Sequence, residues 1–337
     1  MEFSVLGTSG MRISKLALGT ATFGVAPREA DAGRLIGVAL DAGINAIDTA
    51  NAYGNLPHFD RPGVEQASQR QSAEELIGSV LRHRRDSIVL STKASEPVGP
   101  GPNDRGLSRR HLIEQLERSL RRLRTDHVDI FYAHHPDPDT SLEDTLMTLD
   151  DLVRSGKTRC YGLSTYPAWQ SVEALWVSDR RNLCRPACLQ VRYSMAARQA
   201  ETEILPAALR FGLSLVAFSP LAGGLLSPAA VRNRVYAGEK RWGGGAFTES
   251  QLVMAERLDR VAKEWGYSPA QLGLAWTMSR RGVATAIIGA ENEEEVHTSV
   301  SAVEVMNGLG PEQFATLDEI SSLPVIDPAP RASRAVV

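Results

Sequence analysis

The chain has 337 residues, 43% of them hydrophobic, and its 37 basic and 40 acidic residues leave a formal net charge of -3. This composition is that of an ordinary globular protein, so it excludes a disordered chain or a fibre. The near-neutral net charge gives no sign of the basic surface that nucleic-acid binding requires. No apolar run approaches the ~20 residues of a membrane span and the N-terminus lacks a secretion signal, so we expect a cytoplasmic protein with no membrane contact.

Short apolar runs recur along the chain and are separated by amphipathic stretches. The runs are almost continuously apolar, as expected of parallel strands that are covered on both faces. In chain order they comprise residues 16–21, 45–50, 87–92, 128–133, 159–164, 188–193, 214–219 and 284–289. The clearest helical stretches are 30–43, 108–123 and 142–156. Eight strands alternating with helices predict a (β/α)₈ TIM barrel, an α/β fold.

Residues near the ends of these stretches support the predicted helices. Ser108 and Ser141 precede helical patterns and are expected to be N-caps. Gly43 and Gly156 stand where a C′ glycine ends a helix.

Four segments fall outside the repeat, although the whole of 1–337 is expected to form one domain. Residues 1–15 are predicted to form an N-terminal β-hairpin that plugs the barrel floor. Residues 54–71 are a long polar loop at the rim, and we interpret them as a substrate lid. Residues 227–248 are an inserted loop before the last apolar run, accompanied by an extra helix late in the chain, and 324–337 form a tail.

Polar residues follow the apolar runs, at the barrel end where this fold places function. They are Thr20, Thr22, Asp48, Lys93, His134, Ser164, Thr165, Gln190 and Ser219. Lys93 is one of only five lysines and closes an apolar run, so it needs a partner, and Asp48 is the obvious one.

Tyr53 lies five residues beyond Asp48, within reach of the same centre. We expect the Lys93 cation to lower the pKa of the Tyr53 hydroxyl, which suits proton donation to a carbonyl oxygen. His134 would orient that carbonyl.

Several separated motifs along nearly the whole chain resemble the aldo-keto reductases. The opening from Leu6 to Gly24, the DAGIN and DTA motifs with Tyr53 and Gly54, the strand ending in Lys93, and the GKxRxxGxS motif from Gly156 to Ser164 carry the resemblance. Further matches are SPL at 219–221 and IIGA at 287–290. Because these motifs occur in barrel order, the combined signal is much more specific than any one of them.

The resemblance implies a nicotinamide-dependent oxidoreductase with the tetrad Asp48, Tyr53, Lys93 and His134. It also implies that NADP(H) or NAD(H) lies across the rim, with Phe218 stacking under the nicotinamide and Thr165 standing where the family usually has Asn. The implied cofactor-binding residues are Thr20, Ser164, Thr165, Gln190, Phe218, Ser219, Pro220, Leu221, Gly289, Ala290, Glu291 and Glu295. The substrate pocket is expected to include Phe23, His135, Tyr166 and Trp169.

The choice of nucleotide depends on Glu291, which stands where the family usually has an arginine for the 2′-phosphate. A carboxylate there would repel that phosphate and accept a hydrogen bond from a free 2′-hydroxyl. This substitution favours NAD(H), alone or beside NADP(H), unless Arg232, Arg234, Lys240 or Arg241 of the inserted loop supplies the missing charge.

Other functions were weighed against this one. A regulatory module like the potassium-channel β-subunits, which share the fold and the tetrad, remains the alternative. A glycosidase of this fold needs two carboxyl groups at the rim, whereas the fourth and seventh runs end in His134 and Ser219. HHxD at 134–137 has no further ligand at suitable spacing and the three cysteines have no CxxC pattern, so we expect no metal site. The expected partner is a small carbonyl or sugar-like molecule, and the sequence is compatible with a homo-oligomer.

Overall fold

The computed structural model describes residues 1–81, 84–238, 240 and 244–321. Its centre is a closed barrel of parallel strands in the order β10-β3-β4-β5-β6-β7-β8-β9. The strands are β3 (Leu16–Gly19), β4 (Ala46–Asp48), β5 (Val89–Ala94), β6 (Val128–Ala133), β7 (Thr158–Ser164), β8 (Cys188–Arg192), β9 (Ser214–Phe218) and β10 (Val283–Ile288). Each coincides with one of the predicted apolar runs, so the predicted TIM barrel is confirmed.

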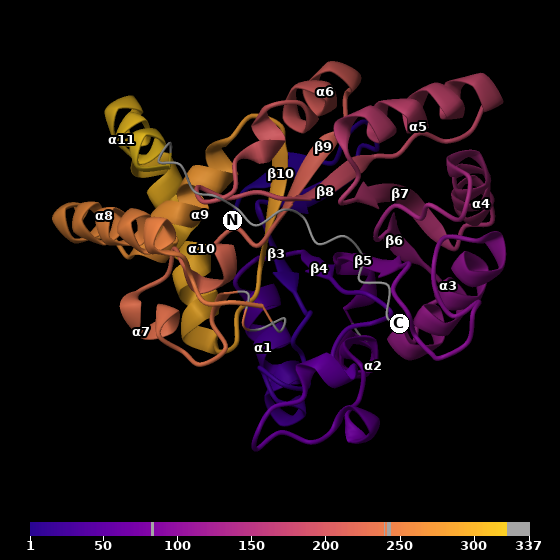
Figure 1. Cartoon of the computed structure of the whole chain (residues 1–337), viewed down its shortest axis with the longest axis horizontal. Coiled ribbons are helices and arrows are strands. Elements are labelled where there is room, and N and C mark those ends of the chain that lie inside the picture. The colour runs from indigo at the N-terminus through magenta and orange to yellow at the C-terminus, as the bar shows by residue number, and fades with distance from the viewer. Residues whose placement is uncertain (82–83, 239, 241–243, 322–337) are drawn as a thin grey trace.

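Helices surround the barrel (Figure 1). Those in the first six strand connections are α1 (Glu29–Asp41), α2 (Ala73–Val80), α3 (Arg109–Leu123), α4 (Leu142–Arg154), α5 (Ala168–Arg181) and α6 (Ile204–Phe211). The β9–β10 connection contains α7 (Ala229–Arg232), α8 (Glu249–Trp265) and α9 (Pro269–Ser279), and α10 (Glu293–Gly308) and α11 (Pro311–Ser321) follow β10. The predicted extra helices late in the chain are therefore present. None of the described helices is long and apolar enough to span a membrane.

The predicted helix ends are also present. The Ser108 and Ser141 side chains accept hydrogen bonds from backbone N–H groups in the first turns of α3 and α4. Gly43 and Gly156 have φ values of 89° and 77°, a left-handed conformation that glycine adopts at little cost after a helix.

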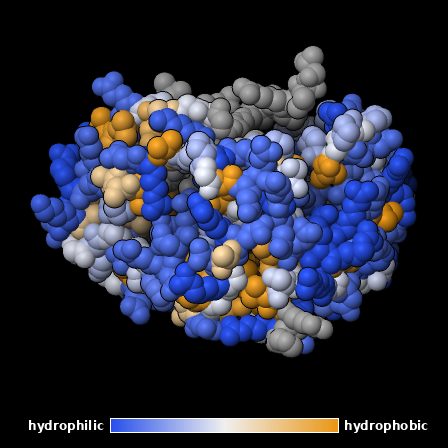
Figure 2. Space-filling model, turned by 90° about the horizontal axis from the view of Figure 1, so that it is seen from below, coloured by the Kyte–Doolittle hydropathy of each residue, from blue (hydrophilic) through white to orange (hydrophobic). Residues whose placement is uncertain are grey.

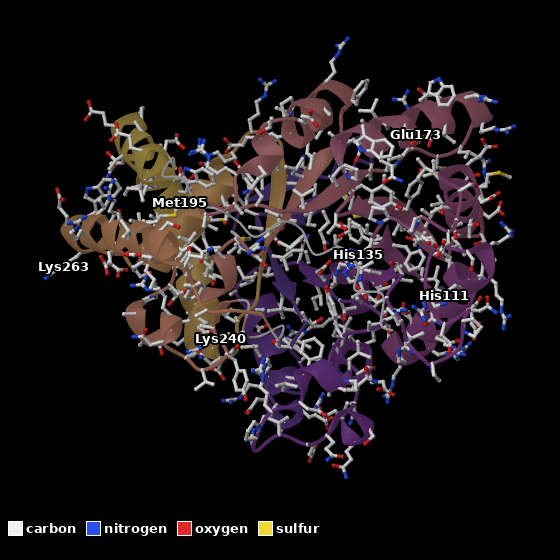
Figure 3. All side chains as sticks on the ribbon, in the orientation of Figure 1. His111, His135, Glu173, Met195, Lys240 and Lys263 are labelled. Atoms are coloured by element: carbon white, nitrogen blue, oxygen red, sulfur yellow. The ribbon has the colours of Figure 1, made fainter. Side chains whose placement is uncertain are left out.

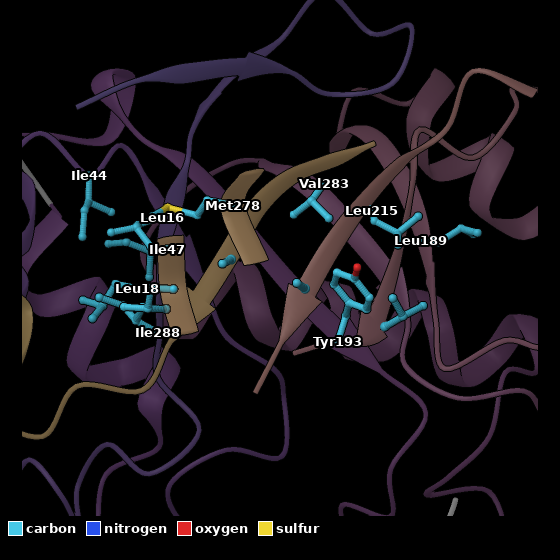
Figure 4. Packing of buried hydrophobic residues seen from close by; sticks show 14 of the residues in the cluster. Leu16, Leu18, Ile44, Ile47, Leu189, Tyr193, Leu215, Met278, Val283 and Ile288 are labelled. Carbon is cyan, nitrogen blue, oxygen red and sulfur yellow. The ribbon is translucent and has the colours of Figure 1, made fainter. Parts of the chain in front are cut away.

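The core has two layers because side chains alternate along each strand. Leu16 and Leu18 of β3 belong to the larger cluster between strands and helices, part of which Figure 4 shows. Ala17, between them, belongs to a second cluster with Tyr132 and Ile287. Side chains therefore fill the barrel, and a substrate must approach from one end. Figure 2 shows a side of the molecule on which hydrophilic residues predominate, as the outer faces of surrounding helices require.

The N-terminal hairpin closes one end of the barrel, as predicted. Its strands β1 (Phe3–Val5) and β2 (Arg12–Ser14) pair antiparallel. The backbone N–H of Gly7 donates to the Ser214 Oγ at the start of β9, at 2.7 Å. A Cβ at Gly7 would lie 2.2 Å from the Ala187 carbonyl oxygen, so this contact requires glycine. Because the hairpin covers the amino ends of the strands, the carboxyl ends remain for the site.

Candidate active site

The loop after β4 positions Tyr53 above the end of the barrel. Asp48 is the last residue of β4, and the backbone N–H of Asn51 donates to the Lys93 carbonyl at 3.1 Å, which continues the pairing with β5 beyond the strand. A turn follows, with φ of 91° at Gly54. A Cβ on Gly54 would lie 2.7 Å from the Phe23 carbonyl oxygen and 2.8 Å from the Ala73 nitrogen, so a side chain would displace the loop. The glycine that follows Tyr53 in the sequence therefore fixes the position of the tyrosine.

The side chain of Lys93, in β5, is completely buried and all three of its N–H bonds have acceptors. Its Nζ lies 2.5 Å from Asp48 Oδ2, 2.8 Å from the Thr49 carbonyl oxygen and 3.3 Å from the Tyr53 hydroxyl oxygen. Burial alone would lower the pKa of the Lys93 ammonium, but the nearby Asp48 carboxylate and Tyr53 hydroxyl hold it above its ordinary value. Lys93 therefore stays positively charged beneath Tyr53.

The second oxygen of Asp48 is also satisfied. Oδ1 accepts hydrogen bonds from Ser91 Oγ at 2.8 Å and from Gln190 Nε2 at 2.9 Å. Thr20, which directly follows β3, holds the backbone of the same residue, because its backbone N–H and its hydroxyl both donate to the Asp48 carbonyl oxygen at 3.0 Å. A buried ion pair with complete hydrogen bonding keeps a fixed geometry, as a catalytic centre requires.

The pKa of Tyr53 differs from the sequence-based expectation. Burial of the hydroxyl raises its pKa above the ordinary value, the Lys93 ammonium opposes this, and the Asp48 carboxylate adds to it. The predicted net lowering is wrong for this arrangement, because desolvation of the phenolate outweighs the attraction of the cation. The hydroxyl consequently keeps its proton at neutral pH and has it available to donate.

His134 directly follows β6 and approaches Tyr53 with its ring edge. Its Nε2 lies 3.5 Å from the Tyr53 hydroxyl, and the two rings are 5.8 Å apart at an interplanar angle of 75°. Burial, together with the charges of Lys93 and His135, lowers the pKa of His134 well below its ordinary value, so the ring is neutral at pH 7. Among the described residues Nδ1 has no hydrogen-bond partner, so we assign the proton to Nε2, which faces Tyr53.

These contacts bring the four residues of the predicted tetrad to one point. A buried hydroxyl that keeps its proton and a neutral imidazole N–H both face the same small volume above Lys93. A carbonyl oxygen placed there would meet two donors, with a fixed positive charge behind them. The arrangement can therefore protonate an oxygen that gains negative charge.

The residues predicted to bind the nucleotide lie around this centre at different depths. Thr20, Ser164 and Gln190 are buried, and Pro220 and Ala290 also lie below the surface. Phe218, Ser219 and Leu221 are partly exposed after β9, and Gly289 is exposed after β10.

The exposed part of this set fits an extended dinucleotide. A Cβ at Gly289 would meet no atom within 4 Å, so the backbone there is open to close approach by a ligand. Helix α10 begins four residues later, and its first turn carries the carboxylates of Glu293, Glu294 and Glu295. Phe218 offers an aromatic ring for the nicotinamide face.

Glu291 and Glu295 lie together and are bridged by the inserted segment. Arg234 Nη1 is 3.2 Å from Glu291 Oε2, and its Nη2 is 2.9 Å from Glu295 Oε1. Four cations of the inserted loop were expected as possible neighbours of this position, and Arg234 is one that forms an ion pair with Glu291. Arg232 instead pairs with Asp259, and Arg241 lies outside the described residues.

The predicted substrate pocket is only partly exposed. Phe23 and Tyr166 are buried in the core between strands and helices, so neither presents a surface to a substrate in this conformation. Trp169 is 66% exposed, at the start of α5. His135 is partly exposed and lies in Figure 3 where Figure 1 shows β5 and β6. Aromatic residues that follow a strand can point inward or outward, and the sequence alone does not distinguish these directions.

The rim segment 54–71 is built around the buried Arg70. It contains short 3₁₀ turns, η1 (Pro57–Phe59) and η2 (Ala67–Gln69). The Arg70 guanidinium donates to the Gly54 carbonyl at 2.9 Å, the Leu56 carbonyl at 3.1 Å, the Asp60 carboxylate at 2.7 Å, and the Glu65 carbonyl. The segment therefore has its own internal support.

Three larger side chains of this segment, His58, Phe59 and Arg61, could contact a substrate, and of these Phe59 is buried. Arg61 stacks over the Tyr236 ring, with 4.4 Å from its guanidinium carbon to the ring centroid. The side chain of His58 lies outside the described part of the chain. The rim segment 54–71 and the inserted loop 227–248 therefore contact each other at Arg61 and Tyr236.

Sequence reasoning missed Glu96, which follows β5 and binds His135. His135 Nε2 is 2.7 Å from Glu96 Oε1, and its Nδ1 is 2.8 Å from Thr165 Oγ1. Glu96 belongs to no motif, and only its place three residues after Lys93 could have pointed to it.

Glu96, His134 and His135 bring potential metal-ligand atoms within 4.8 Å of one another. The two imidazole rings stack at 4.6 Å with an interplanar angle of 12°. Their in-plane nitrogen lone pairs therefore run side by side and do not converge on one ion, so these three residues do not form a coordination site as they stand.

Known proteins resemble this chain over nearly its whole length. The model of the Aldo/keto reductase family matches residues 15–322. The chain is 36% identical to the Uncharacterized oxidoreductase YrpG of Bacillus subtilis over 312 residues, which cover 90% of this chain and 92% of that protein. It is also 33% and 34% identical to a Probable voltage-gated potassium channel subunit beta of Oryza sativa and of Arabidopsis thaliana. Those matches cover 95% and 96% of this chain, and 96% of each relative.

Proposed function

The chain belongs to the aldo/keto reductase family and is an oxidoreductase, and from this premise we propose that it transfers a hydride between a nicotinamide nucleotide and the carbonyl or alcohol carbon of a small substrate. The observation that carries the proposal is the position of the Tyr53 hydroxyl, 3.3 Å from Lys93 Nζ and 3.5 Å from His134 Nε2. The substrate is an aldehyde, a ketone or a sugar-like carbonyl compound.

The chain's own residues supply the proton and the electrostatics of this reaction. A reduced nicotinamide held beside Ser164, Gln190 and Phe218 would supply the hydride for the carbonyl carbon. Tyr53 donates its proton to the carbonyl oxygen, and His134 Nε2–H holds that oxygen by a hydrogen bond. Lys93 stabilises the phenolate that Tyr53 leaves behind, and Asp48 keeps the Lys93 ammonium charged and in place. In the oxidative direction the same groups return the proton.

For the nucleotide, the surroundings of Glu291 support NAD(H), alone or beside NADP(H). Glu291 and Glu295 place two carboxylates where a 2′-phosphate would have to enter, and Arg234 is already engaged by both of them. A free 2′-hydroxyl can donate to Glu291, whereas a phosphate would be repelled unless Arg234 changed partners. Ser164, Gln190 and Phe218 are the residues we assign to the nicotinamide end.

The names of the rice and Arabidopsis relatives favour a second candidate, a regulatory subunit with little turnover. The arrangement of Asp48, Lys93 and Tyr53 does not distinguish the two candidates, because an intact tetrad is compatible with both.

A panel of aldehydes, ketones and sugar-like carbonyls, tested with NADH and NADPH by following nucleotide absorbance, distinguishes the two. The proposal expects repeated turnover with at least one carbonyl compound, and loss of that turnover in Tyr53→Phe. Nucleotide binding without oxidation across the whole panel, in both reaction directions, would instead support the regulatory candidate.

A further inference from the structure

The barrel strand β10 contains an irregular step that turns Thr285 into the barrel. Val283 is paired with Leu215 of β9. The next pair, Thr285 with Val216, advances two residues along β10 and only one along β9. This is the pattern of a β-bulge, which changes the direction of side chains on the bulged strand. Ala284 belongs to the inner cluster, and its neighbour Thr285 also lines a cavity in the barrel interior, although neighbouring side chains of a regular strand point to opposite faces.

The hydroxyl of Thr285 is a polar group in an apolar place. The residue is completely buried, and among the described residues its Oγ1 has no hydrogen-bond partner. A buried hydroxyl in this state is unfavourable, because it has given up its hydrogen bonds to water. A valine of nearly the same shape would occupy the position without that cost. The hydroxyl therefore points to a polar ligand in the cavity.

The cavity has the size and the lining of a site for a single water molecule. It is lined by Ile13 of the N-terminal hairpin and by Asp48 at the carboxyl end of β4, so it lies inside the barrel beneath the tetrad. The centre of a water molecule can lie within about 10 Å³ of this space, which is just enough to hold one. A buried water makes about three hydrogen bonds. Three lining residues carry hydroxyl groups, namely Ser91, Tyr132 and Thr285, and all of them are buried.

We propose that the cavity binds one water molecule between the hydroxyl groups of Thr285 and Ser91, and that Thr285 acts through this water as a positioning residue for Asp48. The Ser91 hydroxyl has one proton, with Asp48 Oδ1 at 2.8 Å and the Ile47 carbonyl oxygen at 3.4 Å as its acceptors. Hydrogen bonds in a chain strengthen one another, so a water that donates to the Ser91 oxygen strengthens the bond from Ser91 to Asp48. The other oxygen of Asp48 binds Lys93. The effect on turnover rests on the proposed oxidoreductase function, whereas the water site does not.

Two variants of Thr285 separate this role from simple packing. Thr285→Val keeps the shape of the side chain without its hydroxyl, and Thr285→Ser keeps the hydroxyl without the methyl group. If the residue only packed, the valine variant would match the wild type and the serine variant would be the poorer one. The inference expects the opposite order, because one hydrogen bond is lost in Thr285→Val, where kcat should fall about fivefold, and is kept in Thr285→Ser.

The Michaelis constants and a control variant complete the kinetic test. The KM values for the nucleotide and the carbonyl substrate should change by no more than about twofold, since Thr285 touches neither. Thr277→Val is the matched control, because Thr277 is a completely buried threonine of the outer helix α9. Its hydroxyl already donates to the Gly273 carbonyl oxygen at 2.9 Å. This variant is expected to keep the wild-type kcat.

High-resolution crystal structures of the wild type and both Thr285 variants test the water directly, without turnover. A water within hydrogen-bond distance of the residue 285 hydroxyl and of Ser91 Oγ is expected in the wild type and in Thr285→Ser, and not in Thr285→Val. A dry cavity in the wild type would overturn the inference and leave the oxidoreductase function intact. A water that is present while kcat is equal in all three proteins would overturn the positioning role. Failure of the wild type to turn over any carbonyl compound would count against the proposed function and the positioning role together, and the crystals would still decide the water site.

Discussion

Glu291→Arg tests the interpretation of the nucleotide site. In the wild type, a 2′-phosphate would meet the Glu291 and Glu295 carboxylates, with Arg234 paired to both of them. Two unit charges 4 Å apart interact by about 4 kcal/mol near a protein surface. The two carboxylates are 18% and 26% exposed, and Arg234 compensates one charge, so the net repulsion is smaller. We therefore assign about 1 to 2 kcal/mol to the net repulsion of the 2′-phosphate, which corresponds to a discrimination of roughly tenfold or more against NADPH.

The substitution reverses the charge at Glu291 and adds a group that can bind a phosphate with paired hydrogen bonds. It also removes one partner of Arg234, which then remains bound to Glu295 alone. The ratio of kcat/KM for NADPH over that for NADH is expected to rise by about 100-fold.

The assay measures initial rates with both reduced nucleotides at one saturating carbonyl substrate. Glu294→Arg is the matched control, because it makes the same charge change on an exposed position of the same helix. It is expected to leave the ratio within about twofold. A wild type that prefers NADPH by tenfold or more, with the ratio unmoved in Glu291→Arg, would refute the reasoning.

Three further predictions concern the tetrad and the rim. Lys93→Met is expected to abolish most turnover. Because Lys93 lowers the pKa of Tyr53, the alkaline limb of the pH–rate profile of any remaining activity is expected to move to higher pH, and an unshifted limb would contradict this. The folded-state pKa of His134 lies below that of the unfolded chain, so its contribution to stability is complete above about pH 6.5 and is lost as the pH falls from there. Urea titrations from pH 7 to 5 should therefore show a drop in the free energy of unfolding, up to about 1.4 kcal/mol per pH unit, that His134→Gln lacks, and parallel curves would contradict it. In Arg70→Met, the segment 54–71 is expected to open about 100-fold more often and to become a site of limited proteolysis. The KM for the substrate should rise and the nucleotide affinity should stay unchanged, whereas protease resistance equal to that of the wild type would contradict this prediction.

The barrel and the tetrad were predictable because both depend on short-range patterns. Apolar runs marked the strands, and parallel strands of a barrel place their carboxyl ends at one rim, so Asp48, Lys93 and His134 had to come together. Tyr53 followed from its spacing to Asp48 and from the glycine after it.

The remaining features depend on how loops fold, which local patterns do not encode. The direction of the Tyr53 pKa shift is set by burial, whereas the sequence shows only the neighbouring charge. Phe23 and Trp169 were assigned to one pocket as aromatics near strand ends, yet the first is buried and the second exposed. The bridge from Arg234 to Glu291 joins residues 57 positions apart through a loop without a motif.

The most direct test of the central claim is single-turnover oxidation of bound NADH or NADPH by a carbonyl substrate in the wild type and in Tyr53→Phe, beside nucleotide affinity measured by fluorescence. Removing the hydroxyl keeps the ring and its contact with His134, so the nucleotide should bind as in the wild type. The rate constant should fall by about 10²–10⁴-fold, the usual contribution of a general acid. A Tyr53→Phe variant that keeps more than about a tenth of the wild-type rate would contradict the assignment of Tyr53 as the acid and the mechanism built on it.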